Sequence, residues 1–132
     1  NTICRYLAAC EARGRHDLLP AAPRERAAVE QWMDWQATEL NNAWRYAFMA
    51  LVRKSPAHAD AQLLATGIAH WNRHMQMLEG QLEKTGAYAA GASVNRWWMT
   101  PMERPALPAV RAYFERLSER PAFLRHGRNG TP

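Results

Sequence analysis

The segment from residue 57 to residue 85 constrains the fold more than any other, because its apolar residues recur at alternating steps of four and three. The series is Leu64, Ile68, Trp71, Met75, Leu78 and Leu82. Residues at this spacing lie on one face of an α-helix, and the alternation suits near-antiparallel packing against a second helix. The sequence therefore predicts a long helix that begins near Ala57, buries one face and is closed by Thr85 and Gly86.

Prolines and glycines divide the rest of the chain, because both residues interrupt regular helices. Pro23 suits the first turn of a second long helix, whose apolar residues recur at three- and four-residue steps until Pro56 ends it. The remaining helices are expected at residues 2–13, 93–99, 108–120 and 122–126. Val110, Phe114 and Leu117 should face inward. No stretch alternates as a strand does, so the sequence predicts an all-α fold.

Two cysteines, Cys4 and Cys10, lie in the expected first helix, which carries an apolar face and which Gly14 should end. Their separation fits neither a CxxC redox pair nor a zinc site, and two thiols make no disulfide framework. We expect buried, inert thiols and a cytoplasmic protein. No apolar run approaches the length needed to cross a bilayer, so we expect no membrane partner.

The chain has a net charge of +5, which would suit an anionic partner. Its arginines are spread along the chain between acidic residues, so we expect a solvated basic surface and no nucleic-acid binding. Six tryptophans in so short a chain indicate a core, an interface or a pocket rich in indoles. His70 and His74 are one helical turn apart, as in two-histidine metal sites, but no third ligand is evident, so we expect no metal.

Three segments resemble the cytosolic glutathione S-transferases of bacteria. In the closing segment, Pro105-x-Leu107 leads into a helix that ends in Arg120-Pro121-Ala122-Phe123. Residues 26–35, which read RAAVEQWMDW, are similar to the first long helix of that family's C-terminal domain. The opening, NTICRYL, resembles the last helix of its thioredoxin-like N-terminal domain. The resemblance implies a domain remnant at 1–14, a linker at 15–22 and the helical domain at 23–132.

The chain departs from the family pattern in two places. A Glu-Ser pair that binds the γ-glutamyl part of glutathione precedes the residues that match Asn1 and Thr2, and the residue that contacts the glutathione sulfur lies further upstream. Neither is present in this chain. Members also follow a Tyr-x-x-Gly stretch, matched by residues 88–91, with a Ser/Thr-x-x-Asp capping box. Ser93 has no Asp three residues later, so we expect a missing segment near 91–93.

The resemblance implies a glutathione S-transferase that conjugates the glutathione thiolate to a hydrophobic electrophile, acting as a homodimer. This chain would supply the wall of the electrophile pocket, with Trp44, Phe48, Met49 and Trp97, and with Trp98 as a further candidate. Asn1 and Arg45 would contact glutathione, and Arg53 could do so too. Helical spacing alone indicates core packing for the aromatic residues and a solvated surface for the arginines.

Two other functions fit the same residues. The helical domain of this family also occurs as a non-enzymatic protein-interaction module. The tryptophan-rich part of the chain would alternatively serve as a pocket for an apolar ligand. A fold shared with an enzyme does not by itself establish a reaction, so these alternatives stay open at this point.

Overall fold

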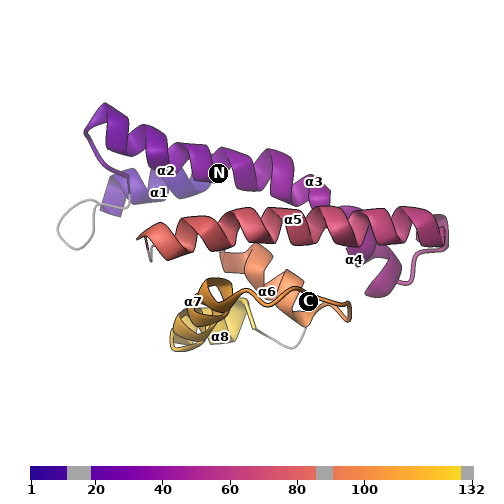
Figure 1. The fold of residues 1–132 in the computed structure, drawn as a ribbon. Coiled ribbons are helices and arrows are strands. Elements are labelled where there is room, and N and C mark those ends of the chain that lie inside the picture. The colour runs from indigo at the N-terminus through magenta and orange to yellow at the C-terminus, as the bar shows by residue number, and fades with distance from the viewer. Residues whose placement is uncertain (12–18, 86–90, 129–132) are drawn as a thin grey trace.

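The computed structural model describes residues 1–11, 19–85 and 91–128 (Figure 1). Within these ranges it contains helices and no strand, which confirms the all-α prediction. The α-helices are α1 (Thr2–Glu11), α2 (Pro23–Trp35), α3 (Asn41–Ala43), α4 (Arg45–Leu51), α5 (Ala61–Thr85), α6 (Gly91–Met99), α7 (Pro108–Ser118) and α8 (Pro121–His126). A π-helical segment, Gln36–Leu40, joins α2 to α3, and a 3-10 turn, Pro56–His58, precedes α5. The expected stops at Gly14 and Gly86 and most of the expected linker at 15–22 lie outside the described residues.

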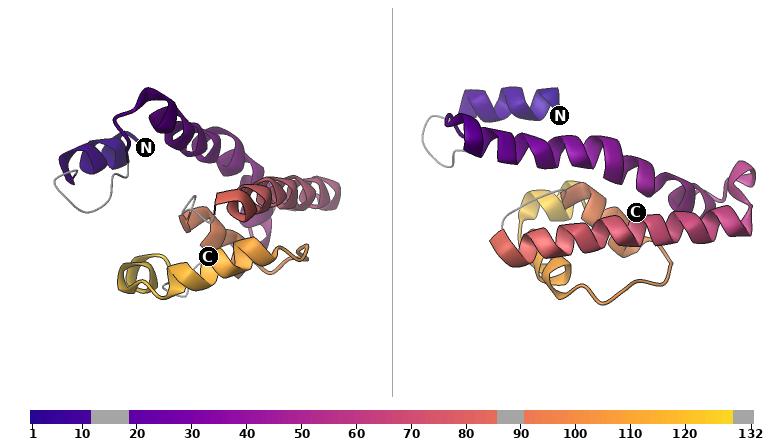
Figure 2. Two further views of the ribbon diagram at one scale, coloured as in Figure 1. Left: turned by 60° about the vertical axis from the view of Figure 1, so that its left-hand side comes forward. Right: turned by 45° about the horizontal axis from the view of Figure 1, so that its top comes forward.

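The long helix α5 forms the centre of the molecule. In Figure 1, α2 and α3 lie above α5, α4 emerges below it near its start, and α6, α7 and α8 lie below it. The right-hand view of Figure 2 shows α1 lying along α2, on the side of α2 that faces away from α5. The core therefore forms where α5 packs against α4 and α7, and where α6 packs against α7.

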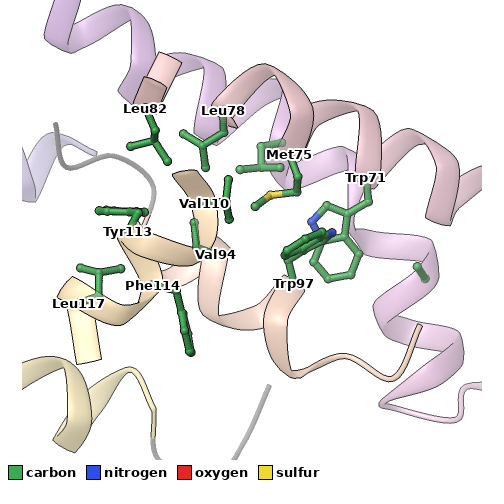
Figure 3. Packing of buried hydrophobic residues seen from close by; sticks show 12 residues of the cluster. Trp71, Met75, Leu78, Leu82, Val94, Trp97, Val110, Tyr113, Phe114 and Leu117 are labelled. Atoms are coloured by element: carbon green, nitrogen blue, oxygen red, sulfur yellow. The ribbon is translucent and has the colours of Figure 1, made fainter. Parts of the chain in front are cut away.

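The apolar series of the central helix is buried as its spacing predicts. Trp71, Met75 and Leu78 are fully buried and Leu82 is 4% exposed, whereas Leu64 and Ile68 are half-buried at the outer end. Residues of α6 and α7 complete the cluster, as Figure 3 shows: Val94, Trp97, Val110, Tyr113, Phe114 and Leu117. Burial of a large apolar side chain contributes about 1.5–3 kcal/mol, so this cluster dominates the stability of the domain.

The central helix begins later than the sequence pattern predicts. It starts at Ala61 rather than near Ala57, and a 3-10 turn occupies residues 56–58. The reason is local: the Oδ1 atom of Asp60 accepts a hydrogen bond from the backbone N–H of Leu63 at 2.8 Å. Asp60 thus satisfies one of the N–H groups that lack a partner in the first turn, and it fixes the start of the helix.

The second long helix is not continuous, contrary to the expectation for residues 23–55. It passes from α2 through the π-helical segment and α3, and it ends at Leu51. The backbone at Lys54 then turns with φ 52°, a left-handed conformation that L residues rarely adopt. The backbone N–H groups of Val52 and Arg53 both donate to the carbonyl of Phe48, so hydrogen bonds within the last turn end the helix before Pro56.

Helix α1 exposes most of its apolar side chains instead of burying them. Ile3 is 73% exposed, Tyr6 68% and Leu7 53%. Both cysteines are also exposed, so the expectation of buried thiols is wrong. The physical reason is that α1 is tied to α2 by polar contacts from its other side, which place no core against its apolar face.

Those polar contacts come from Arg5 and Asn1. The Nη2 atom of Arg5 donates to Asp34 Oδ1 at 2.6 Å, and its Nε lies 3.4 Å from Glu30 Oε1. The side-chain amide of Asn1 donates to the backbone carbonyl of Met33 at 2.6 Å.

Among the described helices, none is long and apolar enough to span a lipid bilayer.

Candidate functional site

Two of the expected site residues, Trp44 and Phe48, form an aromatic pair at the α4 end of the domain. Their ring centroids are 5.2 Å apart with an edge-to-face arrangement. They are neighbours because residues four apart share one face of a helix. Phe48 is 5% exposed, whereas Trp44 is half-buried and its Nε1 donates to Asn41 Oδ1 at 3.0 Å. In this pair, therefore, Phe48 is buried and Trp44 is partly accessible to solvent.

Two arginines lie against this pair. The guanidinium carbon of Arg96, from α6, is 4.2 Å from the ring centroid of Trp44 and 5.2 Å from that of Phe48. The guanidinium carbon of Arg53, just after α4, is 5.6 Å from the centroid of Phe48. We call these four residues the aromatic-arginine cluster. Each guanidinium is within the range in which a cation is attracted to an aromatic face.

The electrostatics of the cluster are unbalanced. Burial, and secondly the charge of Arg53, lower the pKa of Arg96 from its ordinary value. The Nε atom of Arg96 is buried and has no hydrogen-bond partner among the described residues. Within the described part of the chain, neither Arg53 nor Arg96 forms an ion pair with a carboxylate. Two cations therefore share an aromatic pair without a described counter-charge.

The other expected site residues lie at several places. Met49 follows Phe48 on α4 and is half-buried, whereas Arg45 is exposed at the start of α4. The side-chain amide of Asn1 donates a hydrogen bond to the backbone carbonyl of Met33, on α2. Trp97 is 1% exposed in the core, where its Nε1 donates to Asn72 Oδ1 at 2.9 Å. The structure thus brings Trp44 and Phe48 together, whereas Asn1 lies before α1 and contacts α2.

A separate open cavity of about 410 Å³ lies between α6 and the segment that leads into α7. Its lining is Trp97, Trp98, Arg104, Pro105, Ala106, Leu107, Pro108 and Arg111. The ring of Trp98 stacks on Phe114 with centroids 5.1 Å apart. Arg104 donates to the backbone carbonyls of Trp97 at 3.2 Å and Thr100 at 2.7 Å, and burial lowers its pKa. The cavity has the indole wall and the few polar groups that suit a small apolar ligand.

The histidine pair makes no metal site in the part of the chain that the structure describes. The rings of His70 and His74 are 4.6 Å apart, but no group of three or more metal-ligating side chains gathers within the described residues. His74 is 6% exposed, contacts the backbone carbonyl of His70 through Nδ1 at 2.9 Å and stacks on Trp35. Its role in this structure is packing between α5 and α2.

Arg96 is the residue that the sequence pattern did not single out. It lies three residues after Ser93, where the capping box of the family would have an Asp, and within an otherwise largely apolar helix. An isolated charge in such a helix is a signal that could have identified it, because a cation on a buried face needs a partner. Its contact with α4, however, depends on a tertiary arrangement that helical spacing does not reveal.

Comparison with known proteins identifies relatives along nearly the whole chain. No family model matches the sequence. The glutathione S-transferase GstB of Escherichia coli strain K12 is 29% identical over 92% of this chain, as is GstB of strain O6:H1. The chain spans 62% of the length of these curated relatives.

Solved structures agree with the sequence relatives. The theta class glutathione S-transferase of Xanthomonas axonopodis pv. citri, a citrus canker pathogen, is 31% identical, with a TM-score of 0.84 over 96% of this chain and 70% of its own. The same protein with glutathione bound gives the same values. The helical arrangement described above matches the C-terminal helical domain of such enzymes. With this identity and coverage, the chain belongs to the glutathione S-transferase family.

Proposed function

We propose that this chain supplies the helical domain of a glutathione S-transferase, which conjugates glutathione to hydrophobic electrophiles. The observation that carries the proposal is the combined sequence and structural similarity to a transferase whose glutathione complex is known. In the proposed reaction, the glutathione thiolate attacks the electrophilic carbon, a carbon–sulfur bond forms, and the leaving group takes the displaced electron pair. The proton of the thiol goes to solvent or to a base before the attack.

The proposed role of this chain is to form the electrophile pocket. Trp44 and Phe48 offer a large aromatic surface with one accessible edge, and Met49 extends it along α4. Trp97 supports the pocket from the core through its hydrogen bond to Asn72. Aromatic and apolar side chains of this kind remove water from an electrophile and hold it for attack.

Helix α1 supports the proposed domain division. We assign residues 1–14 to a thioredoxin-like domain, residues 15–22 to a linker and residues 23–132 to the helical domain. The exposed face of Ile3, Tyr6 and Leu7 has the chemistry of a surface that packs against another domain. Asn1 and Arg45 are the residues of this chain that we assign to glutathione, and no residue of this chain is assigned to the sulfur.

The proposed protein works in the cytoplasm as a homodimer, without a metal ion, a nucleic-acid partner or a membrane partner. Glutathione is its proposed co-substrate. The second candidate function is a non-enzymatic module that binds apolar ligands or another protein. The observation in favour of that candidate is the open cavity of about 410 Å³ beside Trp97 and Trp98, which lies apart from the aromatic-arginine cluster.

The experiment that tests the proposal begins with the intact mass of the protein isolated from its natural source, together with peptide mapping upstream of Asn1 and around Gly91. A mass well above 15.1 kDa, with peptides of a thioredoxin-like domain, supports the transferase. That protein should then conjugate glutathione to 1-chloro-2,4-dinitrobenzene. A mass of 15.1 kDa, no conjugation and uptake of an apolar dye without glutathione would support the second candidate.

A further inference from the structure

The aromatic-arginine cluster contains more positive charge than its surroundings compensate. The guanidinium carbons of Arg53 and Arg96 both lie within 5.6 Å of the ring centroid of Phe48, and the charge of Arg53 acts on Arg96. The two like charges repel each other, and desolvation of Arg96 adds a further cost. In a folded protein such an arrangement is stabilised when an anion binds between the cations.

Cation–π contacts offset only part of this cost. Such a contact attracts the guanidinium group to the ring face, but it supplies no acceptor to the N–H donors. The buried Nε of Arg96 has no acceptor among the described residues. An arginine fork binds carboxylate and sulfonate oxygens well, because its N–H groups lie in one plane and point in similar directions.

The accessible edge of the cluster indicates what else the ligand contains. Arg53 is exposed, while Trp44 and Arg96 are half-buried, so the cluster is partly accessible from solvent. A ligand that touched both would carry an aromatic ring next to an anionic group. A neutral aromatic compound would use the wall and leave the arginines unpaired.

We propose that Arg53 and Arg96, over the Trp44–Phe48 pair, bind the anionic group of an aromatic ligand. The cluster then selects aryl carboxylates or aryl sulfonates over neutral aromatic compounds. The identity of this ligand as the electrophile of the conjugation rests on the proposed function, but its binding to the cluster does not. Arg53 and Arg96 are specificity residues in this proposal, because they contact the ligand away from any reacting atom.

The test compares two probes that differ in charge and little in shape: naphthalene-1-sulfonate and its neutral sulfonamide. Their dissociation constants for the intact protein are measured by titration calorimetry without glutathione. We expect the sulfonate to bind about tenfold or more tightly, because a charge-assisted hydrogen bond contributes about 1.5–3 kcal/mol. Added salt should weaken the binding of the sulfonate and leave the binding of the sulfonamide nearly unchanged.

Variants locate the effect. Arg53→Met and Arg96→Met should each reduce the ratio of the two dissociation constants several-fold, and the double variant should bring the ratio close to one. Arg73→Met, on the exposed side of α5, serves as the matched control and should keep the ratio of the original protein. The ratio is taken within each variant, so a general loss of stability affects both probes alike. Arg53 is exposed, which makes its variant the one least affected by folding.

Several outcomes would overturn the proposal. Equal binding of the two probes, binding of neither probe, or a ratio unchanged in both arginine variants would each do so. Displacement of the sulfonate by millimolar glutathione would assign the arginines to the glutathione carboxylates instead. None of these measurements needs conjugation, so a failure of the transferase proposal is recognised separately, by the absence of activity in the intact protein.

Discussion

Glu79 of α5 accepts a hydrogen bond from the backbone N–H of Val110 at 2.7 Å, across the core and at the start of α7. Its other carboxylate oxygen accepts one from the N–H of Ala109 at 2.8 Å. Glu79 is only 7% exposed. A carboxylate on the first N–H groups of a helix satisfies donors that have no partner inside the helix, and it interacts well with the helix dipole. The central helix thus caps α7 from outside.

Replacing Glu79 with Ala should lower the free energy of unfolding by about 2–3 kcal/mol, since two buried N–H groups lose a charged acceptor. Glu79→Gln should cost less, because the amide retains one acceptor oxygen. Glu83→Ala, one turn further along α5 and exposed, is the control and should change little. Urea unfolding followed by circular dichroism measures all three. Equal losses for Glu79→Ala and Glu83→Ala would show that the cap is not effective.

Asp60→Ala should destabilise the protein by about 1 kcal/mol, because the Leu63 N–H at the start of α5 loses its acceptor. Asp60→Asn should retain most of the stability, since an asparagine side chain caps helices as well as aspartate does. Amide hydrogen exchange at the first turn of α5 is the direct readout and should rise only in the alanine variant. If the asparagine variant lost as much stability as the alanine variant, the side chain of residue 60 would not act as a helix cap.

Two buried tryptophans should respond differently to replacement by Phe. Trp97→Phe breaks the hydrogen bond to Asn72, whereas the Nε1 of Trp71 is buried without a partner among the described residues. The loss of ring volume is the same in both, so the difference between the two unfolding free energies isolates the hydrogen bond. We expect Trp97→Phe to cost about 1 kcal/mol more. Thermal and urea unfolding of the two variants side by side test this, and a reversed order would contradict it.

Lys54→Gly should stabilise the protein by up to about 1 kcal/mol, because Lys54 has φ 52° and glycine adopts such angles without steric cost. The same change at Lys84, in the last turn of α5, should destabilise by a similar amount, since glycine is a poor helix former. The melting temperatures of the two variants should therefore move in opposite directions. A loss of stability at both positions would mean that the left-handed turn is not strained.

Much of the helical layout could be predicted from the sequence. The face of α5 that includes Trp71 and Leu78 is buried as its spacing indicates, and Val110, Phe114 and Leu117 face inward as expected. These predictions succeed because a 3.6-residue period reports directly which residues share a helix face. Pro23 and Pro108 likewise mark the starts of α2 and α7, whereas α8 begins at Pro121, one residue earlier than expected.

Other features depend on contacts that no local pattern contains. Glu79 and Val110 are 31 residues apart, and Arg96 reaches Trp44 from another helix, so neither partnership is visible in a helical window. The cysteines were expected to be buried because apolar neighbours surround them in the sequence. Instead, the contacts of Arg5 with α2 fix the orientation of α1. In this orientation the face of α1 that includes both cysteines is exposed to solvent.

The π-helical segment precedes the aromatic-arginine cluster, so the position of Trp44 relative to α2 depends on the number of residues in that segment as well as on their identity. Such a segment accommodates one more residue than the same turns of α-helix, and one residue corresponds to a rotation of about 100° around the helix axis. Deletion of Ala37 would let an uninterrupted α-helix form through residues 36–40 and would turn Trp32 and Trp35 away from the side that Trp44 and Phe48 share. Insertions and deletions here would thus reorient the tryptophans although no tryptophan was replaced.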